Sequence, residues 1–274
     1  GDWGISADSL AVVNVEGIGE RLFFFAHVEP DELTTDYMLW VSDGTPAGTV
    51  EVKNILDGCP DGGCTTTHEM VEFDGRAFFP ASGPTGHELW ASDGTEAGTV
   101  LIKDISPTSH SYPNRLTVVG DLLFFLANSD GNSNGELWVS DGTTAGTYQL
   151  MVSDNPDIEN LTAYDGRLFF TVWTDTYGEE LWTSDGTVGG TTLFADLYEG
   201  GAGSGYPESS SPKDLTVANG LLFFSAADTD GHGRELWVTD GTQSRTLLVH
   251  ELKLYAYYGE VGPRGMAEVG DTLF

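Results

Sequence analysis

The sequence predicts an all-β protein, a β-propeller built from four-stranded antiparallel blades. Three observations predict it: one phrase returns five times with small changes, each copy divides into short strands separated by turn residues, and no segment has helical periodicity. The phrase is Glu-Leu-Trp-x-Ser-Asp-Gly-Thr-x-x-Gly-Thr, and its tryptophans lie 44 to 55 residues apart, which is the length of one blade. These tryptophans are Trp40, Trp90, Trp138, Trp182 and Trp237.

The third copy shows how one repeat divides into strands. Its first two expected strands, 115–119 and 122–127, are separated by Gly120-Asp121, and two more are expected at 136–140 and 147–152. Asp74-Gly75, Asp165-Gly166 and Asn219-Gly220 are equivalent two-residue turns that accept positive φ angles, and Gly270-Asp271 reverses the order. The second strands are apolar on both faces, as expected where sheets stack on sheets; the others are 22–26, 77–81, 168–172 and 221–226.

We expect a single domain over residues 1–274. Its copies are predicted at 9–56, 68–106, 114–154, 159–198 and 213–252, with a partial sixth copy at 264–274. Five and a half blades do not close a ring, so the expectation is a five-bladed ring with an extra hairpin or a portion of a ring of six to eight blades. A stacked solenoid is the structural alternative.

The repeated residues are expected to build the fold. Each Trp is predicted to pack between adjacent sheets with its indole N–H on a backbone carbonyl, and the alternative is a ring of exposed aromatic platforms for sugars. Each Asp is predicted to hold a turn by accepting backbone N–H groups; these residues are Asp43, Asp93, Asp141, Asp185 and Asp240. The glutamates that precede Leu-Trp are expected to be structural acceptors rather than catalytic acids; they are Glu88, Glu136, Glu180 and Glu235, with Met38 in the first copy.

Charge narrows the classes of partner. Lys and Arg number 11 and Asp and Glu number 43, which gives a net charge of −32, so the chain repels nucleic acids and anionic membranes. No apolar run approaches the roughly 20 residues that cross a bilayer, and no membrane span is expected. An acidic surface suits salty water or divalent cations, with plain solubility as the alternative.

The two cysteines and the start of the sequence suggest a place outside the cell. Cys59 and Cys64 flank a Gly-rich turn and are predicted to form a small disulfide, with free thiols or zinc as alternatives. The sequence begins Gly-Asp-Trp, and a processed protein or a fragment is expected to begin in this way. A secreted or cell-surface location is therefore predicted.

Short acidic loops between second and third strands are candidate calcium sites. Alternating Asp or Asn with a following Gly resembles half of a calcium loop, and a solvated turn is the alternative; the residues are Asn128, Asp130, Asp175, Asp228 and Asp230. No other cofactor is expected. The six histidines have no metal-ligand spacing, and no catalytic motif is present, so no catalytic residue is predicted.

The chain resembles the ELWxxDGT repeat family of bacterial secreted and surface proteins over nearly its whole length. The motif is intact at 88–95, 136–143 and 180–187, and it departs at Met38, at Thr239 and at 243–246. The resemblance implies a propeller outside the cell without an established activity.

We therefore predict a non-catalytic extracellular scaffold or protein-interaction module, and not an enzyme. The expected partners are other surface proteins, with glycans as candidates, within a larger assembly. A carbohydrate-binding propeller is the second hypothesis, and a propeller hydrolase is the third.

Overall fold

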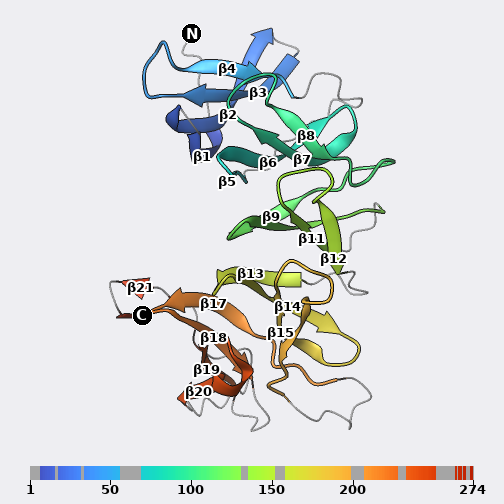
Figure 1. The fold of residues 1–274 in the computed structure, drawn as a ribbon, viewed down its shortest axis with the longest axis vertical. Helices are drawn as coiled ribbons and strands as arrows, with labels where there is room; N and C mark the ends of the chain where they lie inside the picture. Colours follow the sequence, from blue (N-terminus) through green and yellow to red (C-terminus); the bar gives the residue numbers. More distant parts are fainter. Residues whose placement is uncertain are drawn as a thin grey trace. The chain divides into compact units, whose positions relative to one another are not determined.

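The computed structural model of the chain describes residues 7–15, 18–31, 34–55, 69–130, 135–151, 158–198, 207–227 and 233–250, with residues 263, 265, 266, 268, 269, 272 and 273 near the end of the sequence. These described residues form five four-stranded antiparallel sheets and one two-stranded hairpin, without an α-helix (Figure 1). The all-β prediction is confirmed. The chain divides into two compact units, residues 1–149 and 150–274, and the expectation of a single domain stays a prediction.

The first unit contains three sheets in chain order. The first consists of β1 (Ala7–Val15), β2 (Gly19–Asp31), β3 (Thr34–Ser42) and β4 (Val50–Lys53). The second consists of β5 (Val71–Phe73), β6 (Arg76–Gly83), β7 (Gly86–Ser92) and β8 (Val100–Lys103). The third consists of β9 (Asn114–Val119), β10 (Leu122–Ala127), β11 (Glu136–Ser140) and β12 (Tyr148–Met151). The boundary between the two units falls within β12. Each sheet is a meander in which every strand pairs with the next.

The second unit contains two sheets and a hairpin. The fourth sheet consists of β13 (Ile158–Tyr164), β14 (Arg167–Thr174), β15 (Gly178–Ser184) and β16 (Thr192–Ala195). The fifth consists of β17 (Lys213–Ala218), β18 (Leu221–Ala227), β19 (Arg234–Thr239) and β20 (Leu247–His250), with a 3-10 turn η1 (Gln243–Arg245) before the last strand. The hairpin of β21 (Glu268–Val269) and β22 (Thr272–Leu273) lies within the predicted sixth copy.

Two-residue turns join the first and second strands of three sheets. Asp74, Asp165 and Asn219 have φ angles of 52°, 48° and 52°, and the glycine after each also has a positive φ. Two successive positive φ angles define the tight hairpin turn that matches the twist of its strands. The turn prediction at these positions is confirmed.

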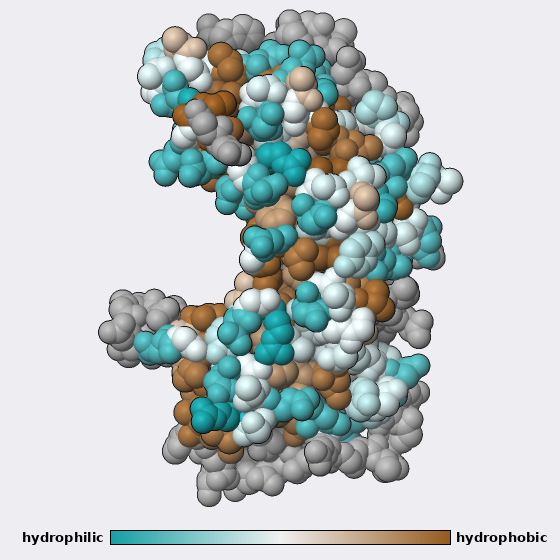
Figure 2. Space-filling view, viewed as in Figure 1, coloured by the Kyte–Doolittle hydropathy of each residue, from teal (hydrophilic) through white to brown (hydrophobic). Residues whose placement is uncertain are grey.

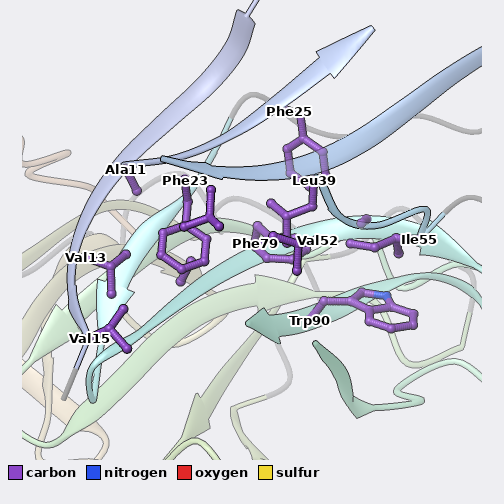
Figure 3. Close-up of a cluster of buried hydrophobic side chains, with 13 residues drawn as sticks. Ala11, Val13, Val15, Phe23, Phe25, Leu39, Val52, Ile55, Phe79 and Trp90 are labelled. Carbon is purple, nitrogen blue, oxygen red and sulfur yellow. The ribbon is translucent and has the colours of Figure 1, made fainter. Parts of the chain in front are cut away.

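Sheets of the first unit stack through alternating side chains. Phe79 and Trp90 of the second sheet lie in a cluster with Phe23 of the first sheet (Figure 3). Phe78, the neighbour of Phe79 in β6, lies instead in a cluster with Phe125 of the third sheet. Successive residues of a strand point to opposite faces, so an inner strand between two sheets must be apolar at every position.

The same stacking builds the second unit. Phe169 and Phe194 of the fourth sheet form a buried cluster with Leu222 and Phe224 of the fifth. The rings of Phe169 and Phe194 meet edge to face, with centroids 4.9 Å apart, an arrangement that aromatic pairs favour. The sheets therefore supply each other's cores.

Polar residues gather on the surface. Figure 2 shows hydrophilic and pale residues over much of the visible face, with apolar patches between them. Within the described ranges, no helix has the length and apolar character to cross a membrane.

Candidate functional site

A buried carboxylate ties the second sheet to the linker that leads to the third. The Glu88 side chain is fully buried in β7. One carboxylate oxygen accepts the N–H of Ile105 at 3.0 Å and the hydroxyl of Ser111 at 2.5 Å, and the other accepts the N–H of Ser111 at 3.1 Å. The linker is thus held at both of its ends by one side chain.

The second unit repeats this arrangement. Glu180 in β15 is fully buried and accepts the N–H of Leu197 at 3.2 Å and the N–H of Ser210 at 2.7 Å. The hydroxyl of Ser210 also bonds with this carboxylate. Glu136 in β11 differs, because it accepts the N–H and hydroxyl of Ser129 at 3.1 and 2.8 Å. These contacts agree with the expectation of structural acceptors.

Burial shifts the pKa of the two carboxyl groups that bind the linkers, Glu88 and Glu180. It raises the pKa of Glu88 and of Glu180 to about 7 in each case, while the hydrogen bonds from serine oppose the shift. Ser111 also donates to the carbonyl of His87 at 3.2 Å. A protonated Glu88 can therefore donate to the Ser111 oxygen while the serine proton goes to that carbonyl. Since Ser111 and Ser210 are buried and bonded to carboxylates, neither hydroxyl is placed to attack a substrate.

The five repeated aspartates adopt the same turn. In each copy one carboxylate oxygen accepts both the N–H and the hydroxyl of the Thr two residues later; the residues are Asp43, Asp93, Asp141, Asp185 and Asp240. The hydroxyl bond from Thr143 is the main cause that lowers the pKa of Asp141. A Cβ on Gly146 would lie 2.1 Å from that carboxyl group, so the second glycine of the phrase is required by close approach.

Replacing Asp141 with Ala is expected to lower the free energy of unfolding by about 1 kcal/mol, as loss of a side-chain cap does. Asp141→Asn keeps the accepting oxygen and is expected to lose less than half of that amount. Urea denaturation of the two variants measures the difference. Equal losses in both variants would show that the negative charge, and not the acceptor geometry, holds the turn.

The tryptophans occupy two environments. Trp90 and Trp138 are each 7% exposed and lie within the clusters between sheets, and Trp237 packs against the cluster of the second unit. Trp40 is half-buried on the face of the first sheet that points away from the second sheet, and Trp182 is also half-buried.

The predicted hydrogen bond from indole to backbone carbonyl is wrong. The Nε1 of Trp138 donates to the Glu136 carboxylate at 3.1 Å. The other four indole nitrogens meet no acceptor among the described residues. Trp40 and Trp138 each stack on a phenylalanine ring of the neighbouring strand, and carbonyls of paired strands are already bonded within the sheet.

Lysines cover the indoles of the next sheet. The Nζ of Lys53 lies 5.9 Å from the centre of the Trp90 ring and donates to the carbonyl of Thr99 at 2.9 Å. Lys103 repeats this on Trp138 at 6.0 Å and donates to the carbonyl of Thr147 at 2.6 Å. A cation over an aromatic face is attracted to it, so each pair clamps two sheets together. Sequence reasoning missed these clamps, although lysine recurs at the end of the fourth strand in the first two copies.

The structure says little about the predicted disulfide and the predicted calcium loops. Cys59, Cys64, Asp228 and Asp230 lie outside the described residues. Asn128, Asp130 and Asp175 are described, and no group of three His, Cys, Asp or Glu side chains within the described ranges is placed to hold a metal ion. Calcium binding and the disulfide stay predictions.

A pocket of about 350 Å³ lies between the second and third sheets. Its lining is Glu72, Phe73, Asp74, Val118, Gly120, Asp121 and Asp141. Two hairpin turns and one of the repeated Asp turns supply the lining, so four carboxyl groups surround it. This pocket was not predicted from the sequence, because its turns belong to different copies and meet only when the sheets stack.

Comparison with solved structures finds proteins that share the fold of this chain. No family model matches the chain, and a search of the curated proteins also finds no match; the resemblance to the ELWxxDGT family stays a prediction. A serine-to-alanine variant of puromycin hydrolase, solved with PGG, is 20% identical with a TM-score of 0.50, and the match covers 89% of this chain and 39% of the hydrolase. A second puromycin hydrolase structure is 20% identical with a TM-score of 0.49 and covers 90% and 39%. The chain thus spans about two fifths of the length of these hydrolases.

This finding contradicts two predictions, the non-catalytic scaffold and the statement that the chain is not an enzyme. A solved structure that shares the fold is a hydrolase, and a propeller hydrolase was the last of the three hypotheses. The reasoning failed because repeated residues report on the contacts that hold the sheets, while the chemistry of a larger enzyme can lie outside the repeats. The chain has an all-β, propeller-like fold that it shares with part of puromycin hydrolase.

Proposed function

We propose that this chain is the β-propeller part of a hydrolase that cleaves small amide-containing compounds of the puromycin class. One observation carries the proposal: a solved puromycin hydrolase matches 89% of this chain in fold, with a TM-score of 0.50. The sheets are proposed to be blades of that propeller. A location outside the cell belongs to the same proposal and is supported by the net charge of −32 and by the close spacing of the two cysteines in the sequence.

The proposal assigns the chemistry to residues outside the repeated phrase. The buried carboxyl groups of Glu88 and Glu180 bind linkers, and the repeated aspartates bind turns. An acid or base must reach the proton that it transfers, and these groups already have partners within the fold. The propeller is proposed to contribute substrate binding, which fits a match that covers 39% of the hydrolase.

The test uses the natural protein that carries this sequence. Puromycin and a panel of aminoacyl p-nitroanilides are incubated with it, and release of the amine is followed by mass spectrometry and absorbance. A fluorophosphonate is added in parallel, because the matched hydrolase was solved as a serine-to-alanine variant. We expect hydrolysis and labelling of a serine outside residues 7–250.

Two outcomes would contradict separate parts of the proposal, the hydrolase assignment and the location of the chemistry. A folded protein that hydrolyses none of the compounds overturns the hydrolase assignment. Labelling of a serine within residues 7–250 keeps the hydrolase assignment but shows that the chemistry lies in the propeller. Asp43→Ala serves as a matched control, because Asp43 holds the same kind of structural turn outside the pocket lining, and the variant is expected to leave turnover unchanged.

A further inference from the structure

Two histidines lie where the linker between the second and third sheets meets β7: His87 in the strand and His110 in the linker. The N–H of His87 donates to Nδ1 of His110 at 2.9 Å, and the carbonyl of His87 accepts the N–H groups of Ser111 and Tyr112 at 3.1 and 3.2 Å. Gly86 precedes this contact with a φ of 116°, and a Cβ there would lie 2.4 Å from the carbonyl of Ser109. The linker is therefore pressed closely onto the start of β7.

The second unit has the same joint without histidine. The N–H of Glu179 donates to the hydroxyl oxygen of Ser209 at 2.9 Å, and the carbonyl of Glu179 accepts the N–H of Ser211 at 2.9 Å. Gly178 has a φ of 71°, and a Cβ there would lie 2.3 Å from the carbonyl of Glu208. Glu179 and Ser209 thus replace His87 and His110, while the backbone contacts are kept.

We propose that the pair His87 and His110 is an acid-sensitive release for the linker at 104–113, and that the linker of the second unit lacks this release. A histidine nitrogen accepts a hydrogen bond only while it carries no proton. Protonation of His110 at Nδ1 turns the acceptor of the His87 N–H into a donor, which removes the bond and sets two N–H groups against each other. The oxygen of Ser209 cannot undergo this change.

The surroundings of His87 do not stabilise a positive charge on its ring beside a protonated His110. Its ring is 1% exposed, and neither ring nitrogen has a hydrogen-bond partner among the described residues. The His87 ring stacks on the Tyr112 ring with centroids 5.3 Å apart, and the His110 ring also lies 5.3 Å from the Tyr112 ring, at a tilt. Burial and, second, the nearby His110 lower the pKa of His87 to about 4.

The charged groups around the joint do not neutralise the histidines. Glu88 follows His87 in β7, but its carboxylate binds Ile105 and Ser111, and Asp104 lies near that carboxylate. Glu69 binds the backbone N–H groups of residues 115 and 116 beyond the linker. The strand opposite His87 contributes Ser82, which carries no charge.

Acid acts in opposite directions on the two parts of the joint. The pKa of Glu88 and that of Glu180 are both raised to about 7, so acid favours the neutral, buried form of each carboxyl and tightens both linkers. The histidine pair adds a loosening effect in the first unit alone. Comparing the two linkers within one molecule therefore cancels the carboxyl contribution and isolates the histidines.

Hydrogen–deuterium exchange of the intact chain tests the proposal. Exchange of the peptides that cover 104–113 and 207–212 is measured between pH 7.5 and 5 and divided by the intrinsic rate at each pH. Protection of the first linker is expected to fall at least about tenfold relative to the second, because a joint that closes only on a neutral histidine loses up to tenfold in population for each pH unit once the solution is acidic enough to protonate that histidine. Equal pH dependence of the two linkers would overturn the proposal.

Substitutions that swap the residues of the two joints provide the controls. H87Q/H110S is expected to abolish the relative loss of protection, and H110S alone to reduce it. S209H is expected to introduce acid-dependent loosening into the second linker, and it tests the proposal even where the double variant does not fold. A double variant that is protected at pH 7.5 and still loosens in acid contradicts the role of the histidines, as does an S209H linker that stays indifferent to acid.

Discussion

Replacing Glu180 with Ala is expected to lower the free energy of unfolding by about 2–4 kcal/mol, since buried N–H groups lose their acceptor. The side chain is fully buried and accepts from the N–H groups of Leu197 and Ser210. Without it, those N–H groups lose the carboxylate that accepts their hydrogen bonds. Urea denaturation of the chain measures the loss, and Glu179→Ala, one residue earlier on the opposite face of β15, is the matched control with an expected loss below about 1 kcal/mol.

Glu180 also has a predictable pH dependence. Its pKa is about 7 in the folded chain against an ordinary value of 4.5, so the folded state binds the proton more tightly than the unfolded state does. The contribution of this group is then fully present below pH 4.5 and is lost as the pH rises through 7. Glu180→Gln cannot titrate, and the stability of the wild type relative to this variant is expected to fall between pH 4.5 and 7. A constant difference over that range would show that the carboxyl titrates as an exposed glutamate.

Trp90→Ala is expected to cost about 3–5 kcal/mol, because it opens a cavity between two sheets. Its ring lies in the cluster of the first and second sheets, so close to Gly83 that a Cβ there would lie 2.7 Å away. The variant also removes the ring beneath Lys53. The loss is measured by urea denaturation at constant pH.

Trp40→Ala is the matched control for this prediction. Trp40 occupies the equivalent place in the first sheet, where Leu22 on the same face is 36% exposed and Leu10 and Val12 are 59% and 60% exposed. An indole that is half-buried on an open face loses less contact, so about 1–2 kcal/mol is expected. Equal losses at Trp40 and Trp90 would mean that the position in the repeat, and not the stacked neighbour, determines the effect.

Local chemistry made the strands and turns predictable from the sequence. Asp74, Asp165 and Asn219 stand before glycine because two positive φ angles are needed there. The third copy was predicted with strand ends within one residue of β9 to β12. The aspartate turns are equally local, because each closes on the Thr two residues later.

Contacts between distant segments were not predictable in the same way. Glu88 reaches Ser111 and Glu180 reaches Ser210, over 23 and 30 residues, and these bonds depend on the path of an irregular linker. The acidic pocket and the lysine clamps likewise form only when one sheet lies on another. The hydrolase likeness escaped the sequence because 20% identity preserves a backbone without preserving a motif.

The lysine clamps make the chain its own reporter of sheet stacking. The sequence has four lysines, at 53, 103, 213 and 253, and the amines of the first two are engaged by a ring and a carbonyl of the following sheet. Amine acylation requires a free, unprotonated nitrogen, so these two sites are shielded while the layers are together. When two neighbouring sheets separate, the lysine between them becomes open to acylation. Peptide mass spectrometry at Lys53 and at Lys103 therefore measures the separation of each pair of sheets individually.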